Sequence, residues 1–386
     1  MCVSKYIIGG AVMDISVCYM VKNEEDNLRK SVMSIKHIAD EIIVVDTGSV
    51  DRTKAVAGEL GAMVYDFPWC DDFSAPRNYA IDKAHGEWIF FLDADEYLRD
   101  NISKQQILAI LATMNGKDVI MFLLRHIMDM NNRAYFHTET APRIFRRDSK
   151  IRYQGCIHEA IMHSERPLQV AFAPEEYYIW HTGYLRNISP QKAKRNLRLL
   201  KKAMEHDEYH PIYDKYLADC YIDLKEYEKA LVHIKRFIQN GCTIHGGESS
   251  AYHVLLECLR KLNLPYQDFL FWARQACEKF PKLPEYYAEQ GMCLSAMGEL
   301  AEARQKLMCS LEMYKNNSAY GQHGSYFSQE VAAKVAARLG EIAAVQQNID
   351  EAAKWFTQAM DYSPHNKEIK AKVESFIHKA EEELGR

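Results

Sequence analysis

The stretch at residues 88–96 reads Trp-Ile-Phe-Phe-Leu-Asp-Ala-Asp-Glu, and it decides the class of fold. Five consecutive apolar residues bounded by polar ones are typical of a strand buried inside a sheet. Similar runs recur around it, and segments with helical spacing of apolar residues separate them. The expected strands are Ile15–Val21, Glu41–Asp46, Ala62–Phe67, Trp88–Leu92 and Val119–Leu124. Alternating strands and helices predict an α/β domain with a mostly parallel sheet that is flanked by helices.

The chain changes character near residue 185. Before it, helices are expected at Glu24–Ile38 and at Asp51–Leu60, the second closed by Gly61, and residues 125–184 are rich in strands and loops. After it, nearly every segment has a helical pattern. We therefore expect an extension at residues 1–13, the α/β domain at 14–188 and a helical domain at 189–386.

An internal repeat is visible in the helical part. Small residues twelve apart recur in similar frames, and a weaker copy at Ser250–Pro281 starts 34 residues before the next copy at Pro284. The small pairs are Ala218/Ala230, Gly291/Ala303 and Gly340/Ala352. This pattern resembles the tetratricopeptide repeat, in which small residues let two antiparallel helices approach closely. A plain helical bundle is the alternative, and the agreement of three frames favours the repeat.

Composition excludes several classes of protein. Of 386 residues, 48% are apolar and 26% are charged, which is typical of a soluble globular chain. The net charge of −5 gives no sign of the basic surface that binds nucleic acid. No stretch approaches the roughly 20 apolar residues of a membrane span, and residues 6–13 do not form a convincing signal peptide. Ten cysteines without a Cys-x-x-Cys pair read as reduced thiols. We therefore expect a cytoplasmic protein.

The first chemical signal is the pair Asp93 and Asp95 directly after an apolar strand. Side chains two apart on an extended segment point to the same side. In open α/β sheets, ligands bind outside the carboxyl ends of the strands. Carboxylate oxygens suit Mg²⁺ or Mn²⁺, and such an ion would neutralise a diphosphate leaving group. Alone, an Asp-x-Asp in a solvated loop is common, so the buried strand before it is what favours a metal site.

A second expected strand, Glu41–Asp46, ends at Asp46, and the turn after it contains Gly48. A carboxylate at the carboxyl end of a strand is a natural partner for ribose or base groups. Ser49 and Asp51 are more simply helix caps.

Several segments, in this order, resemble the family 2 glycosyltransferases with the GT-A fold. The resemblance covers about residues 14–185 and is closest to the branch of lipopolysaccharide-core glucosyltransferases and repeat-containing peptide glycosyltransferases. The matching segments are the strand and Lys-Asn-Glu turn at 15–25, Val45–Thr53, the Arg-Asn segment at 73–78, Asp93-Ala94-Asp95, Gly155–Glu159 and Trp180–Tyr184.

The resemblance implies an inverting transfer of a hexose or N-acetylhexosamine from a nucleotide sugar, with UDP the leading nucleotide. Asp93 and Asp95 would hold Mn²⁺ or Mg²⁺ on the diphosphate. The nucleotide sugar would be contacted by Asp46, Arg77, Asn78, Asp93, Lys22 and Glu24. Arg143 could neutralise phosphate or an acidic acceptor, whereas the basic run Lys192–Lys202 reads as an exposed helix face.

Two roles stay open at this point. Glu159 is the candidate general base, because a carboxylate near the acceptor can take its proton, but it could equally orient His158. His181 could complete the metal shell as a neutral imidazole, although a lone histidine beside an aromatic is more often a packing residue.

The repeats favour a peptide or protein acceptor, because stacked helix pairs form a concave surface. They would equally suit a homodimer. A transferase for lipopolysaccharide or another surface glycan is the alternative, and a non-catalytic repeat scaffold is a further one. The sugar, the acceptor atom, the metal and the oligomeric state are not fixed by the sequence.

Overall fold

The computed structural model describes residues 7–8, 11–12, 14–113, 116–127, 135–183, 190–206, 210–241, 248–316 and 328–383. The chain forms two compact units, Met1–Tyr213 and Asp214–Arg386. Helix α5 (Pro190–His206), which we expected at the start of the helical domain, belongs to the first unit. At the N-terminus, the short strands β1 (Ile7–Ile8) and β2 (Ala11–Val12) pair with each other.

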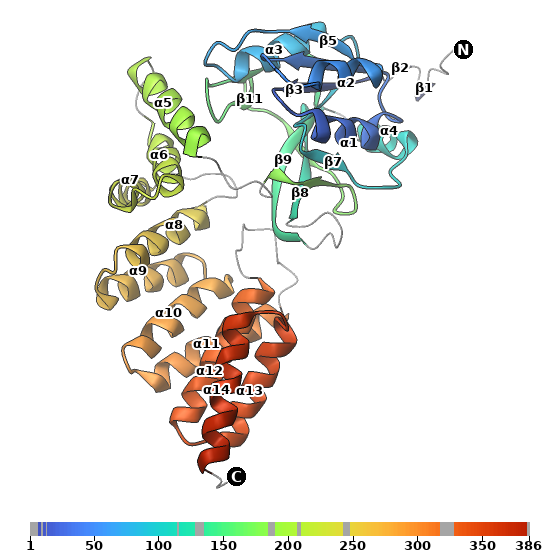
Figure 1. Cartoon of the computed structure of the whole chain (residues 1–386). Helices are drawn as coiled ribbons and strands as arrows, with labels where there is room; N and C mark the ends of the chain where they lie inside the picture. The colour runs from blue at the N-terminus through green and yellow to red at the C-terminus, as the bar shows by residue number, and fades with distance from the viewer. Residues whose placement is uncertain are drawn as a thin grey trace. The chain divides into compact units, whose positions relative to one another are not determined.

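One large sheet organises the first unit (Figure 1). Within the described residues its strand order is β5-β4-β3-β6-β9-β8-β13-β7, with β12 beside β8. The bounds are β3 Ile15–Val21, β4 Glu41–Asp46, β5 Met63–Asp66, β6 Trp88–Leu92, β7 Glu96–Leu98, β8 Val119–Ile127, β9 Tyr135–Arg146, β12 Val170–Phe172 and β13 Tyr178–His181. Strands β5, β4, β3 and β6 are parallel, and β9 is antiparallel to both β6 and β8. The predicted mostly parallel α/β sheet is thus confirmed, with an antiparallel extension.

Among the four parallel strands, the direction in which successive strands are added to the sheet reverses between β3 and β6. The chain passes from β3 to β4 and β5 on one side, and then returns to place β6 on the other side of β3. Helices leave the two neighbouring strands in opposite directions at such a switch point, so a crevice opens at the carboxyl ends of those strands. Val21 ends β3 and Leu92 ends β6, so the residues that follow them lie at this crevice.

Helices cover both faces of the sheet. On one face α1 (Glu25–Ile35), α2 (Thr53–Glu59) and α4 (Lys104–Thr113) pack on alternate residues of β3 such as Val17 and Tyr19. On the other face α3 (Ser74–Lys83) packs with Cys18 of the same strand. The hairpin of β10 (Ile151–Gln154) and β11 (Ala160–His163) adjoins α3. Burial on both sides explains why these strands are continuous apolar runs.

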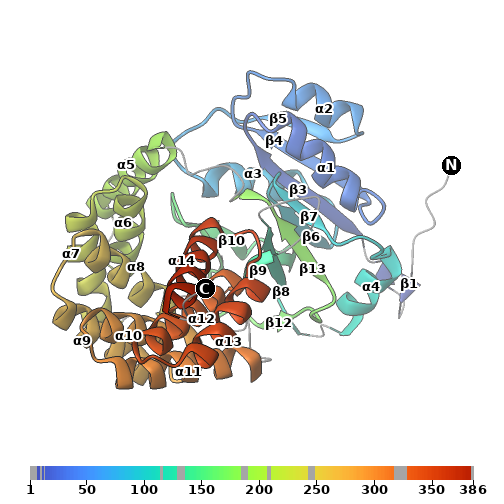
Figure 2. The same cartoon turned by 60° about the horizontal axis from the view of Figure 1, so that its bottom comes forward.

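The second unit is an array of antiparallel helix pairs, and Figure 2 shows its helices side by side. Its described helices are α6 Ile212–Asp223, α7 Tyr227–Gln239, α8 Glu248–Lys261, α9 Tyr266–Lys279, α10 Pro284–Ala296, α11 Leu300–Asn316, α12 Gln329–Val345, α13 Ile349–Tyr362 and α14 Lys367–Glu383. The predicted repeat copies coincide with the pairs α6/α7, α8/α9, α10/α11 and α12/α13, which confirms the repeat.

Small residues have the role that the repeat predicts. A Cβ atom added at Gly291 would lie 2.6 Å from Cγ of Leu307 on the partner helix. A Cβ at Gly340 would lie 3.0 Å from the ring of Phe356. The sequence at 241–250 and 316–328 predicts loops between the repeats, and most of these residues lie outside the described ones. No helix in the described part of the chain is long and apolar enough to cross a membrane.

Candidate active site

A cavity of about 630 Å³ lies in the first unit, where β3 and β6 end. The turn after β3, the turn after β6 and the loop before β11 all contribute to its wall, as the switch point predicts. Seven of the residues singled out from the sequence line it: Lys22, Glu24, Arg77, Asp93, Asp95, Glu159 and His181. Most of the candidate site therefore comes together in one place, although its residues are spread over about 160 positions of the chain.

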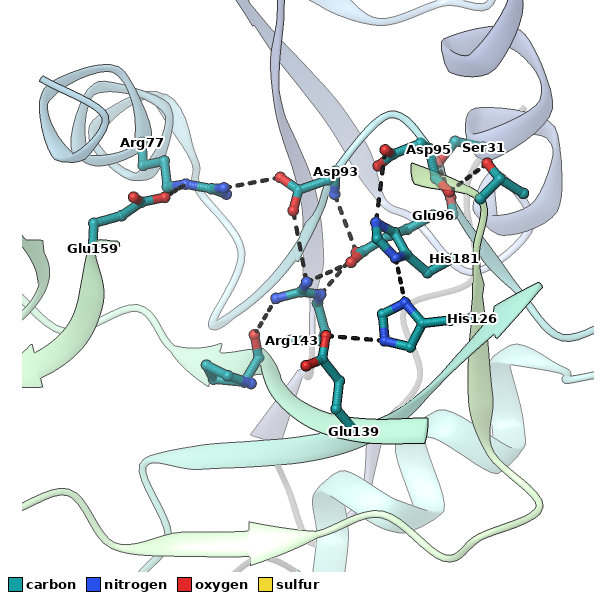
Figure 3. A network of polar contacts seen from close by, with 12 residues as sticks. Ser31, Arg77, Asp93, Asp95, Glu96, His126, Glu139, Arg143, Glu159 and His181 are labelled. Atoms are coloured by element: carbon teal, nitrogen blue, oxygen red, sulfur yellow. Dashed lines mark hydrogen bonds and ion pairs between the residues drawn. The ribbon is translucent and has the colours of Figure 1, made fainter. Parts of the chain in front are cut away.

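A buried arginine connects two of the candidate carboxylates (Figure 3). Nη2 of Arg77 donates to Oδ1 of Asp93 over 2.9 Å, and its Nε donates to Oε1 of Glu159 over 2.6 Å. Only 11% of the Arg77 side chain is exposed. Burial by itself raises the pKa of Asp93, but the charges of Arg77 and Arg143 overcome it and hold this pKa at about 2. Asp93 is therefore ionised throughout the physiological range.

Arg143 is engaged elsewhere. Its Nε and Nη2 form a bidentate pair with Glu96, at 2.8 and 2.5 Å, and Nη2 lies 3.6 Å from Oδ2 of Asp93. Glu96 is 1% exposed and also accepts from the backbone N–H of Asp93 over 3.2 Å. Arg143 does not line the cavity. The structure thus gives it a supporting place beneath the Asp-Ala-Asp turn, in contrast to the contact with phosphate or acceptor expected from the sequence.

Asp95 and His181 face each other across a narrow gap. Oδ2 of Asp95 lies 3.7 Å from Nε2 of His181. The backbone N–H of Thr182 donates to the Asp95 carbonyl over 3.0 Å, which fixes the strand of His181 beside the turn of Asp95. Burial, together with the charges of Asp93 and Glu24, raises the pKa of Asp95 to about 6. Burial lowers the pKa of His181, so its ring is neutral at pH 7.

These residues suit a divalent cation only in part. Across the described residues, no three His, Cys, Asp or Glu side chains form a ready-made metal cage. Mg²⁺ and Mn²⁺ are, however, usually held by one or two carboxylates together with water and substrate phosphates. On the cavity wall Asp95 supplies one such carboxylate, and a neutral His181 adds a ring nitrogen, which is an acceptable ligand for Mn²⁺. Asp93 faces two guanidinium groups instead, so of the three predicted metal ligands only Asp95 and His181 face each other.

The two turns at the carboxyl ends of β3 and β4 are locked together. The N–H of Asn23 donates to Oγ of Ser49 over 2.8 Å, and the N–H of Val50 donates to Oδ1 of Asn23 over 2.9 Å. Asn23 adopts a positive φ of 56°, which asparagine tolerates better than most residues. Ser49 therefore joins the turns and is not a helix cap, whereas Oδ1 of Asp51 does accept from the N–H of Thr53 at the start of α2.

Asp46 is buried just behind this turn. Its Oδ1 accepts from the N–H groups of Gly48 and Ser49 over 2.9 and 2.8 Å. Its Oδ2 is buried and has no hydrogen-bond partner among the described residues. Because a buried carboxylate oxygen without a partner is costly, a ligand that donates a hydrogen bond here would stabilise the site. Asp46 itself does not line the cavity, although its neighbour Thr47 does.

Asn78 does not face the cavity. Its side-chain amide donates to the Tyr153 carbonyl and accepts from the Tyr153 N–H, both at 2.9 Å. Both polar ends are thus used to hold α3 against β10. The Arg-Asn segment expected to face the nucleotide sugar therefore sends only Arg77 to the cavity, because adjacent residues of a helix point in different directions.

Helix α5 supplies residues that the sequence pattern did not single out. Lys192, Arg195 and Asn196 line the cavity, although their segment reads as an exposed basic face. The guanidinium of Arg195 lies over the ring of Phe73, 5.1 Å from its centroid, and donates to Oδ1 of Asn196. No carboxylate of the described residues forms an ion pair with it, and burial lowers its pKa. Helical periodicity marks one face of α5 as basic but does not reveal what that face adjoins.

His126 and Glu139 were not among the site residues predicted from the sequence. His126 is fully buried on β8, and its Nδ1 lies 2.8 Å from Nδ1 of His181. Oε1 of Glu139, on β9, lies 3.1 Å from Nε2 of His126. A histidine within the apolar pattern of β8 was a possible signal, but its partner depends on the register between β8 and β13.

Comparison with known proteins identifies relatives of this chain. Residues 16–165 match the family described as Glycosyl transferase family 2. A TPR repeat-containing protein of Synechococcus elongatus is 35% identical over 181 residues, which are 47% of this chain and 43% of that protein. The glycosyltransferase SunS of the SPbeta prophage in Bacillus subtilis is 28% identical over 232 residues, 57% of this chain and 52% of SunS. The chain thus spans about half the length of these relatives.

Among solved structures, the TPR protein YrrB superimposes on 48% of this chain and on 84% of its own, with a TM-score of 0.38 and 19% identity.

Proposed function

The chain carries a glycosyl transferase family 2 domain, and from its cavity we propose that the chain transfers a sugar from a nucleoside diphosphate donor to an acceptor nucleophile. The observation that carries the proposal is the convergence of Asp93, Asp95, Glu159 and His181 on one cavity at the switch point of the sheet. The donor would lie along the carboxyl ends of β3 and β6. Its nucleoside would approach Thr47, which lines the cavity in front of the buried Asp46.

A departing diphosphate requires positive charge, and α5 is the best source of it. Arg77 is already shared between Asp93 and Glu159, and Arg143 is paired with Glu96. Arg195 has no carboxylate partner among the described residues and faces the cavity beside Phe73. Its planar guanidinium suits a phosphate, because it offers two parallel N–H donors. Lys192 lines the same wall.

Asp95 and His181 would hold a divalent cation, which would stabilise the negative charge of the leaving diphosphate as a Lewis acid. Asp93 would act indirectly. Its carboxylate orients Arg77 and adds negative charge beside Asp95. Lys22 and Glu24 line the donor side of the cavity and would contact the nucleotide sugar.

Glu159 is the proposed base that deprotonates the acceptor. It lines the cavity, 12% of its side chain is exposed, and it lies on the loop before β11. Its Oε1 already accepts a hydrogen bond from Nε of Arg77 in the free protein. A base role therefore requires the bond between Arg77 and Glu159 to loosen as donor and acceptor bind. His158 lines the cavity next to it with a φ of 53° and is the alternative base.

A peptide or protein side chain is the proposed acceptor, and UDP the proposed nucleotide. Both rest on the sequence resemblance, and the acceptor also rests on the helical repeats, since stacked helix pairs suit extended peptides. The sugar would be a hexose or an N-acetylhexosamine.

Calorimetric titration tests the proposal. UDP, GDP and CDP are titrated with and without Mn²⁺ into the full chain, into Asp95→Ala and into the control Asp66→Ala. Asp66 is exposed and pairs with Lys54. We expect Mn²⁺-dependent binding of UDP that is lost in Asp95→Ala and retained in the control. If none of the nucleotides binds in either condition, the transferase proposal fails.

A further inference from the structure

A second histidine lies behind the candidate metal ligand. His126 on β8 and His181 on β13 are directly opposite each other in the parallel pairing of these strands. Their rings are nearly perpendicular, with centroids 4.7 Å apart, and their Nδ1 atoms are 2.8 Å apart (Figure 3). At this distance one Nδ1 carries a proton and the other accepts it. The direction of this hydrogen bond decides which ring nitrogen of His181 carries no proton.

Glu139 fixes that direction. Its Oε1 lies 3.1 Å from Nε2 of His126, on the side of the ring away from His181, at ion-pair distance but without the geometry of a hydrogen bond. Half of the Glu139 side chain, 51%, is exposed, and the oxygens of a carboxylate accept hydrogen bonds. A lone pair on Nε2 would repel it, so Nε2 of His126 carries the proton. In this tautomer of His126 the Nδ1 accepts, and Nδ1 of His181 donates.

Nε2 of His181 is consequently the unprotonated ring nitrogen. That nitrogen lies 3.7 Å from Oδ2 of Asp95 on the cavity wall. The distance is too long for a hydrogen bond between them, but a cation between the two atoms would contact both after a small adjustment. Gly183 keeps the approach open, since a Cβ atom there would lie 2.6 Å from this Nε2.

We propose that Glu139 and His126 are positioning residues that hold His181 as its Nδ1–H tautomer, with the Nε2 lone pair directed at the cation site beside Asp95. The cation itself rests on the proposed function, whereas the tautomer does not. Carboxylate or carbonyl groups behind a ligating histidine commonly orient the ring and raise its basicity. Here the carboxylate of Glu139 does not contact His181 directly, because the buried His126 lies between them.

The tautomer is measured first, in metal-free protein. Histidine is labelled with ¹⁵N, and long-range ¹⁵N–¹H correlation at pH 8 reports which ring nitrogen of each histidine carries the proton. A His181→Gln sample assigns the resonances. We expect His181 to be protonated on Nδ1 and bare on Nε2. Protonation of His181 on Nε2 would overturn the proposal, whether or not the protein binds nucleotides.

The second measurement is Mn²⁺ affinity by electron paramagnetic resonance in the presence of UDP. His126→Leu removes the acceptor, and His126→Gln restores an amide oxygen that can accept from His181. His85→Leu is the control, because His85 also pairs with a glutamate, Glu41, but does not line the cavity. We expect Mn²⁺ to bind about 10–100-fold more weakly to His126→Leu, with partial rescue in His126→Gln.

Metal-free binding of UDP should be the same in all four proteins, which separates a lost metal ligand from a damaged fold. Unchanged Mn²⁺ affinity in a folded His126→Leu protein would refute the positioning role. If the unsubstituted chain binds neither UDP nor Mn²⁺, the proposed function fails. The tautomer of His181 alone then tests whether Glu139 and His126 position its ring.

Discussion

Arg77 and Glu159 are joined by a hydrogen bond of 2.6 Å, from Nε of the arginine to Oε1 of the glutamate. The same guanidinium holds Asp93, so the first aspartate of the Asp-Ala-Asp turn and the candidate base share one cation. Both members of the bond are nearly buried, with 11% and 12% of their side chains exposed. A nucleotide sugar that draws Arg77 toward its phosphates would weaken this bond and release Glu159. Donor binding and base activation would then be coupled.

Replacement of Glu159 tests whether this residue acts as the general base or only orients Arg77. Glu159→Gln keeps an amide oxygen that can accept from Nε of Arg77 but cannot take a proton. We expect UDP affinity to stay within about threefold, while release of UDP from the donor falls about 100-fold or more, as for a lost general base. His158→Gln is the companion variant. If it causes the large loss and Glu159→Gln does not, His158 is the base.

Arg195 should bind phosphate rather than nucleoside. In Arg195→Met we expect the Kd for UDP to rise about 10–100-fold, since a hydrogen bond to a charged group contributes about 1.5–3 kcal/mol. The Kd for uridine should not change. Arg198→Met is the control from the same helix, because Arg198 is exposed and pairs with Asp71. Equal weakening of uridine and UDP in Arg195→Met would place Arg195 outside the phosphate site.

The two aspartates of one turn should affect stability with opposite signs. Asp95 has its pKa raised to about 6 in the folded protein by burial and by the charges of Asp93 and Glu24. The unfolded chain loses this proton near pH 4, so metal-free stability falls as pH rises from about 4 to 6 and stays low above. The penalty is at most about 3 kcal/mol, and the 29% exposure of the side chain reduces it by screening.

Metal-free Asp95→Asn should therefore melt at a higher temperature than the unsubstituted chain at pH 7.5, with no gain at pH 4. Asp93→Asn should melt lower at pH 7.5, because Arg77 and Arg143 lose a carboxylate whose pKa they hold at about 2. Thermal unfolding in EDTA at the two pH values measures both. A loss of stability in Asp95→Asn at pH 7.5 would contradict the raised pKa.

The sheet could be predicted because its physical signals are local. Strands β3, β4 and β6 begin and end where the apolar runs do, since each is buried on both faces. The carboxyl ends of these strands then bring Glu24 and Asp95 to one cavity, although they are far apart in the chain. Sequence reasoning reaches this far because parallel strands align their ends.

Other parts of the site depend on relationships that no local pattern contains. The pairing of His126 with His181 follows from the register of β8 and β13, which crosses more than 50 residues. Arg195 reaches the cavity because α5 is part of the first unit, and the sequence of its basic face is the same whether that face meets solvent or a ligand site. Asn78 and Arg77 are adjacent in sequence, yet the helix directs one to β10 and the other to the cavity.

Gly183 should be required for metal binding and not for folding. A Cβ atom there would lie 2.6 Å from Nε2 of His181 and 2.7 Å from Oδ2 of Asp95. Both are ends of side chains that can rotate away, so Gly183→Ala should fold normally with the two candidate ligands displaced. We expect Mn²⁺ affinity in the presence of UDP to fall at least about tenfold, because the geometry of both candidate ligands is disturbed.

Gly58→Ala is the matched control, because its added Cβ atom meets nothing within 4 Å and it lies in helix α2. Alanine there should leave Mn²⁺ affinity unchanged and raise stability by about 0.5–1 kcal/mol, since glycine is unfavourable inside a helix. Metal affinity by electron paramagnetic resonance and thermal unfolding are measured on both variants. Normal Mn²⁺ binding by Gly183→Ala would mean that the cation, if it binds at all, does not lie between Asp95 and His181.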